Sequence, residues 1–155
     1  MATPDFVLAL REKIGHAPLW LPGVTAVIVR DDEVLLVRRA DTGAWTPVTG
    51  IVDPGEEPAV AAEREALEEA DVVVRCDTLA WVQAIDMIRY ENGDESEYLD
   101  LVFRCTWVSG EPAPADGENT DARWFPIDAL PPMSDNMLER VTTAVGSTGV
   151  TRFNR

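Results

Sequence analysis

Four glutamates lie close together in a segment whose composition predicts a helix, because proline stands in its first turn and strong helix formers follow. They are Glu57, Glu65, Glu68 and Glu69. At about 100° per residue, they fall within an arc of roughly 120° on one side of that helix. The apolar side consists of Ala59, Val60, Ala62, Ala66, Leu67 and Ala70. We therefore expect the apolar side to pack on a sheet and the acidic side to point away from it.

This acidic side destabilises a helix that binds no ligand. Glu65 forms like-charge pairs with Glu68 and Glu69, at three and four residues, and each pair costs roughly 0.2–0.5 kcal/mol. The pairs also lie in the second half of the helix, where the helix dipole disfavours negative charge, and only Arg64 is near to offset them. Three carboxylates on adjacent turns suit a hard cation such as Mg²⁺ or Mn²⁺. The alternative is an ordinary solvated helix face.

The segment from Gly50 to Val72 resembles the Nudix box. That motif is glycine, five residues, glutamate, seven residues, Arg-Glu, an aliphatic residue, any residue, Glu-Glu, any residue, glycine and an aliphatic residue. The matching residues are Gly50, Glu56, Arg64, Glu65, Glu68, Glu69 and Val72. Thr49 and Asp71 depart from the usual glycines. Thr49 still offers a backbone carbonyl as a metal ligand, and aspartate is among the better non-glycine residues for a left-handed helix cap.

The resemblance covers roughly residues 24–130 and implies the family's α/β/α sandwich around a mixed β-sheet. It implies a Mg²⁺-dependent pyrophosphohydrolase, with Mn²⁺ as a possible substitute, that cleaves the diphosphate linkage of a nucleoside diphosphate derivative. Nucleoside triphosphates, dinucleoside polyphosphates and nucleotide sugars all fit this description. The alternative is a catalytically weak Nudix-fold sensor that binds a nucleotide, for which the departures at Thr49 and Asp71 leave room.

The resemblance also assigns roles to residues. Glu65, Glu68 and Glu69 become metal ligands, and Glu65 is the best candidate to orient or deprotonate the attacking water. Arg64 and Glu56 are expected to support the site through an ion pair that fixes the loop against the helix. A further acidic ligand is expected from the loop before the last strand. We select Glu118 for it, with Asp116 and Asp121 as alternatives.

Markers of substrate class are weak. The proline associated with ADP-ribose hydrolases is absent around Met87 and Ile88, and the extended motif of NADH hydrolases is missing. Tyr90 resembles the tyrosine marker of dinucleoside polyphosphate hydrolases, but one tyrosine at one spacing is poor evidence. Arg38 and Arg39 end a predicted strand near the expected cleft. One of them would bind a substrate phosphate there, or they form surface salt bridges.

The remaining pattern predicts the elements that position this segment. An N-terminal helix over 4–14 is an addition to the family core, within a helical segment of residues 1–20, and Gly15 ends it. Strands are expected at 24–30, 33–38, 45–48, 72–88, 98–108 and 122–125, and a last helix from Ser134 to Val145. Residues 50–72 form a loop, the helix and a second loop between the strands.

Composition limits the partners. The 155 residues fit a single domain over 1–155, and the formal charge of −15 without a basic stripe argues against nucleic acid as a partner. No apolar run is long enough for a membrane span, so we expect a cytoplasmic protein with a small-molecule nucleotide derivative as substrate. The N-terminal helix has three candidate roles that the sequence does not distinguish: covering the sheet edge, forming a homodimer contact and shaping a substrate pocket. Cys76 and Cys105 are expected to be buried thiols, although two cysteines could also pair.

Overall fold

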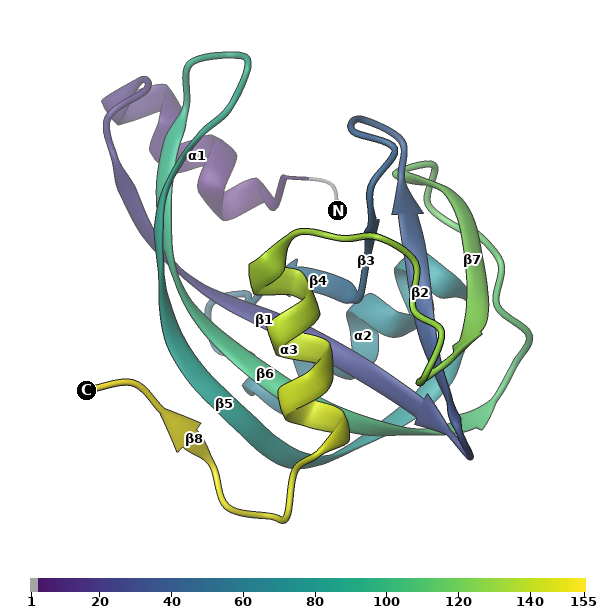
Figure 1. The fold of residues 1–155 in the computed structure, drawn as a ribbon. Coiled ribbons are helices and arrows are strands. Elements are labelled where there is room, and N and C mark those ends of the chain that lie inside the picture. The colour runs from purple at the N-terminus through teal and green to yellow at the C-terminus, as the bar shows by residue number, and fades with distance from the viewer. Residues whose placement is uncertain (1–2) are drawn as a thin grey trace.

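The computed structural model describes residues 3–155, which form a mixed β-sheet with helices on both faces (Figure 1). The sheet order is β3-β2-β1-β6-β5-β8, with β4 paired to β1 and β7 paired to β2. The helices are α1 (Asp5–Ile14), α2 (Pro58–Ala70) and α3 (Asp135–Val145). The strands are β1 (Leu19–Arg30), β2 (Glu33–Arg39), β3 (Trp45–Thr46), β4 (Val48–Ile51), β5 (Val73–Arg89), β6 (Glu95–Ser109), β7 (Asn119–Pro126) and β8 (Arg152–Phe153). The expected α/β/α sandwich is therefore confirmed.

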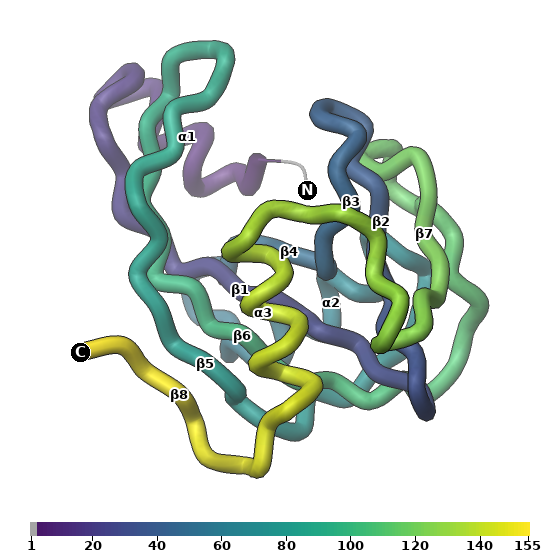
Figure 2. Tube along the Cα trace, in the orientation of Figure 1, coloured from purple at the N-terminus to yellow at the C-terminus, as the bar shows by residue number. Residues whose placement is uncertain are grey.

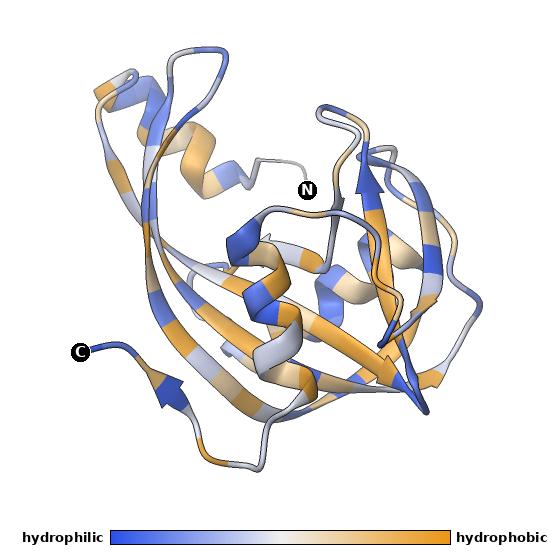
Figure 3. Ribbon diagram, viewed as in Figure 1, coloured by the Kyte–Doolittle hydropathy of each residue, from blue (hydrophilic) through white to orange (hydrophobic). Residues whose placement is uncertain are grey.

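Side chains alternate between the two faces of the central strands. One face forms an apolar core with α2, and the other forms an apolar core with α3. In β2, Leu35 and Val37 join the core under α2, whereas Val34 and Leu36 join the core under α3. Apolar colour accordingly runs along β1 and β2 where the helices cover the sheet (Figure 3). Continuous burial of both faces explains why these strands read as unbroken aliphatic runs in the sequence.

The orientation of α2 differs from the expected one. Val60 and Leu67 are 53% and 50% exposed, whereas Glu65 and Glu69 are buried together with four alanines. The small alanine side chains let the helix lie close to the sheet, and the two glutamates enter at the edge of that contact. The prediction that the acidic side points away from the sheet is thus wrong for Glu65 and Glu69, and this error matters for the chemistry.

The N-terminal helix lies against a long arm formed by β1, β5 and β6 (Figure 2). Val7 packs on Leu21 and Ile51, and Arg11 donates a hydrogen bond of 2.8 Å to the carbonyl oxygen of Glu95 in β6. The helix ends at Ile14 and β1 begins at Leu19, so the helical segment expected over residues 1–20 is shorter. Pairing with β6 extends β1 backwards from the strand predicted at 24–30.

The expectation of two buried thiols is wrong. Cys76 in β5 and Cys105 in β6 lie directly opposite each other in the antiparallel ladder, with Cα atoms 4.0 Å apart, and they form a disulfide. Strand register, which the cysteine spacing of the sequence does not reveal, decides this pairing. None of the helices within residues 3–155 is long and apolar enough to cross a membrane.

Candidate active site

Glu65 is buried between α2 and β4. Strand β4 pairs with β1 and places Gly50 directly beneath the glutamate side chain, where there is no room for a Cβ atom. The Glu65 side chain is only 3% exposed, and its Oε1 accepts a hydrogen bond of 3.0 Å from Nη1 of Arg64. Within residues 3–155, its buried Oε2 has no hydrogen-bond partner. An unsatisfied buried carboxylate oxygen is costly, so this atom is suited to receive a proton or a cation.

Burial also changes the proton affinity of Glu65. Removal from water raises its pKa to about 7, against the opposing effect of the Arg64 guanidinium. A carboxylate with a pKa near neutrality can accept a proton at physiological pH and release it again. The Glu65 side chain therefore combines a free buried oxygen with the basicity that general-base chemistry requires.

Arg64 ties the preceding loop to the helix. Its Nε and Nη2 donate to the two carboxylate oxygens of Glu56 at 2.8 and 3.0 Å, and Nη2 also reaches the carbonyl oxygen of Ile51 at 3.2 Å. These bonds lower the pKa of Glu56 and raise that of Arg64, so both remain charged. Nη1 reaches Oε2 of Glu68 at 3.1 Å. The structure contains the Arg64–Glu56 ion pair expected from the sequence.

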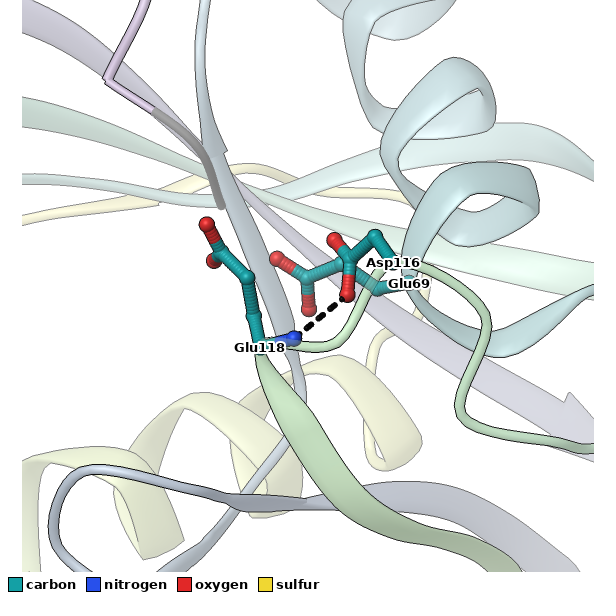
Figure 4. Close-up of side chains that lie close together, drawn as sticks. All are labelled: Glu69, Asp116 and Glu118. Atoms are coloured by element: carbon teal, nitrogen blue, oxygen red, sulfur yellow. Dashed lines mark hydrogen bonds between the residues drawn. The ribbon is translucent and has the colours of Figure 1, made fainter.

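A second acidic group stands at the C-terminal end of α2. Glu69, Asp116 and Glu118 each bring a carboxylate oxygen within 4.8 Å of the others, and Figure 4 shows the three side chains converging. The loop that carries the last two docks on the helix end, where the amide of Ala113 donates to the carbonyl of Ala70 at 3.0 Å. This contact satisfies a carbonyl that the helix end leaves without an internal partner. It explains how Glu118, far along the chain, reaches the helix glutamates.

Asn119 is a site residue that the sequence reasoning missed. Its Nδ2 donates to Oε2 of Glu69 at 3.3 Å, and both side chains are buried. Burial raises the pKa of Glu69, which Asn119 opposes by stabilising the charged form. The only signal in the sequence is that Asn119 directly follows Glu118, at the start of β7.

The other predicted site residues lie around this centre without joining the converging group. Glu68 is half exposed on α2 beside Arg64, and Thr49 lies in β4 opposite Thr25. Asp121, one of the alternatives to Glu118, forms an ion pair with Arg123 instead. Asp71 adopts a left-handed conformation with φ 56° and ψ 34°, which is the conformation that a glycine would supply there. The departure at Asp71 is therefore accommodated by the backbone.

The donor set matches a hard divalent cation. Carboxylate oxygens from α2 and from the 110–118 loop converge, and one buried oxygen of Glu65 has no partner within the described residues. Mg²⁺ and Mn²⁺ prefer oxygen ligands of this kind. The residues present therefore fit such an ion, which would also offset the repulsion among the acids.

A family model described as NUDIX domain matches residues 20–144. The chain belongs to the NUDIX family. The Nudix match covers the strands from β1 to β7, α2 and most of α3, and leaves out α1 and β8.

Several relatives resemble this Nudix chain in sequence. It is 35% identical over 118 residues to the NAD-capped RNA hydrolase NudC of Pseudomonas aeruginosa, which covers 75% of this chain and 40% of that protein. It is 33% identical over 123 residues to a MutT-like protein of Streptomyces ambofaciens, covering 79% of this chain and 72% of the relative. The chain thus spans about two fifths of the length of the NudC relatives it matches.

Solved structures agree on the fold. The MutT NUDIX hydrolase of Burkholderia pseudomallei superposes with a TM-score of 0.65 at 28% identity, covering 81% of this chain and 98% of that chain. An ADP-ribose pyrophosphatase of Streptococcus suis gives a TM-score of 0.65 at 24% identity over 86% of this chain and 98% of that chain, which bears on the fold alone.

Proposed function

We propose that this chain is a divalent-cation-dependent pyrophosphohydrolase, with Mg²⁺ as the expected ion, that cleaves the diphosphate linkage of a nucleoside diphosphate derivative. One observation carries the proposal. Glu65 and Glu69 of α2 are buried at the sheet edge rather than solvated, and Glu69 meets Asp116 and Glu118 there. Buried like charges repel one another, and a bound divalent cation would compensate this repulsion.

The side chains around the site have different proposed roles. Glu65, whose Oε2 has no hydrogen-bond partner within residues 3–155 and whose pKa is raised, would orient or deprotonate the attacking water. Arg64 fixes the carboxylate of Glu65 and, through Glu56, holds the loop that precedes α2. Asn119 orients Glu69.

The cation would be held by Glu65, Glu68, Glu69 and Glu118, together with the backbone carbonyl of Thr49, and Asp116 extends this set. When bound, such an ion polarises the attacking water and neutralises charge that develops on the phosphoryl oxygens. Glu69, Asp116 and Glu118 support the assignment by their convergence, whereas Glu68 and Thr49 enter it through the motif.

The substrate is a nucleoside triphosphate, a dinucleoside polyphosphate or a nucleotide sugar. A second candidate comes from the relatives whose printed name is NAD-capped RNA hydrolase. The acidic charge of −15 argues against long RNA contacts, so an NAD-type linkage is favoured over the RNA body as what this chain would recognise. A sensor that binds without cleaving is the remaining alternative, and it does not require Glu65 to be buried with a free oxygen.

The test is a substrate panel. Purified protein is incubated with nucleoside triphosphates, dinucleoside polyphosphates, nucleotide sugars, ADP-ribose, NAD and NAD-capped RNA, with Mg²⁺, with Mn²⁺ or with EDTA. Glu69→Gln is compared with Glu57→Gln, an exposed glutamate at the N-cap of the same helix. We expect turnover that needs the cation, disappears in Glu69→Gln and survives in Glu57→Gln. Nucleotide binding without any turnover would favour the sensor, and equal loss in both variants would contradict the proposed site.

A further inference from the structure

A cavity of about 260 Å³ opens beside the carboxylate group at the end of α2. Its lining residues are Arg39, Ala40, Asp41 and Glu118. Glu118 belongs both to this cavity and to the converging acids, so the cavity borders the acidic group. The backbone holds them together, because the amide of Ala40 donates to the carbonyl of Glu118 at 2.8 Å. A ligand at the acids therefore extends into a space that contains a guanidinium group.

The alternation of β2 explains why Arg39 faces this cavity. Leu35 and Val37 point toward α2, and Arg39 is the next residue on that side of the strand. The hydrogen bond to Asp41 raises the pKa of Arg39, and the negative charge of Glu69 raises it further. Arg39 thus lies close enough to the acidic group to interact with it electrostatically.

Asp41 fixes the guanidinium in one orientation. Nε and Nη2 of Arg39 donate to the two carboxylate oxygens of Asp41 at 2.9 and 2.6 Å. Within residues 3–155, Nη1 makes no hydrogen bond, so one edge of a preoriented guanidinium remains available. An exposed ion pair of this kind adds little to stability. Stability alone is therefore a weak reason for its position.

We propose that Arg39 is a substrate-binding residue that donates hydrogen bonds to a phosphate of the diphosphate group while the carboxylates hold the cation that this group chelates. The inference rests on the proposed function and deepens it. A diphosphate carries several oxygens, and a guanidinium beside a cation-binding group can bind those that the cation leaves free.

Arg38 provides a matched control. It precedes Arg39 in the same strand and carries the same charge, but it is exposed and its Nε donates to the carbonyl of Gly43 at 3.1 Å. Arg38 does not line the cavity. A general effect of positive charge on an anionic ligand would affect both arginines alike, whereas a specific contact would affect Arg39 alone.

The experiment uses methylenediphosphonate, an inorganic diphosphate analogue with a P–C–P bond that the protein cannot hydrolyse. Its dissociation constant is measured by calorimetry in the presence of Mg²⁺ for the wild type, Arg39→Gln, Arg39→Lys and Arg38→Gln. Mn²⁺ affinity is measured on each protein by electron paramagnetic resonance. We expect Arg39→Gln to weaken analogue binding about 10- to 100-fold, Arg39→Lys to recover part of it, and Arg38→Gln to match the wild type. Mn²⁺ affinity should be unchanged in all four proteins.

The outcomes separate this inference from the proposed function. Absence of Mn²⁺ binding and of turnover in the wild type would overturn the pyrophosphohydrolase itself. Wild-type turnover combined with undiminished analogue binding in Arg39→Gln, or with an equal loss in Arg38→Gln, would overturn the role of Arg39 only. A wild type that binds Mn²⁺ but not methylenediphosphonate would also overturn it.

Discussion

A Cβ atom on Gly50 would lie 2.3 Å from the Cγ, Cδ and Oε1 atoms of Glu65. No real Cβ atom comes so close to another atom, so the glutamate and any larger residue at position 50 exclude each other. Glu65 of α2 can therefore occupy its observed position only because residue 50 of β4 is a glycine.

Gly50→Ala should remove activity while the protein stays folded. The new methyl group displaces the side chain of Glu65, which can swing outward without unfolding the sheet. We expect kcat to fall about 100-fold or more, as for loss of a general base, with a change in Tm of only a few degrees. Steady-state kinetics and thermal unfolding provide the measurement. Unchanged kcat would show that the observed position of Glu65 is not needed for the reaction.

The sequence predicted the elements of the fold well, because alternation, turn residues and the helix caps are local signals. Ser134 caps α3 as expected, accepting a hydrogen bond from the amide of Met137, and Asp71 takes the left-handed cap conformation. How closely α2 packs against the sheet depends on tertiary contacts, which local sequence signals do not predict. Helical periodicity placed Val60 and Leu67 on the buried side, whereas the alanines allow an approach that buries Glu65.

Long-range contacts limited the prediction of the site in the same way. The motif located the glutamates of α2, and the loop position located Glu118. Asn119 was missed because only the β7–β2 pairing and the docked loop bring it to Glu69. The pairing of Cys76 with Cys105 depends on strand register across β5 and β6, which the sequence does not specify.

Glu65→Gln should stabilise the protein in the absence of metal. The buried carboxylate has an oxygen without a partner among the described residues, and its pKa is raised by burial, so its charged form is disfavoured in the folded state. At pH 8 in EDTA, urea unfolding should give a gain on the order of 2–3 kcal/mol for a variant that is catalytically inactive. Added Mg²⁺ should stabilise the wild type more than the variant. A loss of stability in EDTA would mean that the charge of Glu65 is well compensated without a cation.

The Glu56–Arg64 pair should make stability depend on acidic pH. Arg64 lowers the pKa of Glu56 below its ordinary value of 4.5, so the folded state holds the charged form more strongly than the unfolded state does. The contribution is therefore present above about pH 5 and is lost as pH falls through the lowered pKa. Glu56→Gln should reduce the unfolding free energy at pH 7 by about 1–3 kcal/mol and flatten its decrease toward pH 3. Glu57→Gln serves as the exposed control, and parallel pH profiles for the wild type and Glu56→Gln would contradict the role of the pair.

The Cys76–Cys105 disulfide should contribute to stability. The two cysteines are 29 residues apart in sequence, and closing a loop of this length restricts the unfolded chain by about 3–4 kcal/mol in the chain-entropy description. Reduction, or a Cys76→Ser/Cys105→Ser double variant, should lower Tm accordingly. Intact mass before and after alkylation reports whether the bond forms in the purified protein. Two free thiols under oxidising conditions would contradict the pairing.

Arg140 and Asp100 should stabilise the fold only as a pair. Arg140 of α3 and Asp100 of β6 are both buried, with Nε of Arg140 3.4 Å from Oδ2 of Asp100. Thr25 connects them, because its hydroxyl donates to Oδ1 of Asp100 at 2.9 Å and accepts from Nη1 of Arg140 at 3.0 Å. Burial lowers the pKa of Arg140 and the charge of Asp100 opposes this effect, so Asp100 favours the charged form of Arg140.

Arg140→Met should therefore destabilise the protein by about 3–5 kcal/mol, because it leaves the buried Asp100 without a counter-charge. Asp100→Leu should cost a similar amount by isolating the guanidinium. In the double variant neither charge remains, and most of the loss should be recovered, giving a coupling energy well above that of an exposed pair. Urea unfolding of the four proteins at pH 7 measures this cycle. Additive losses in the double variant would mean that each side chain stabilises the fold through its own packing and not through the shared charge.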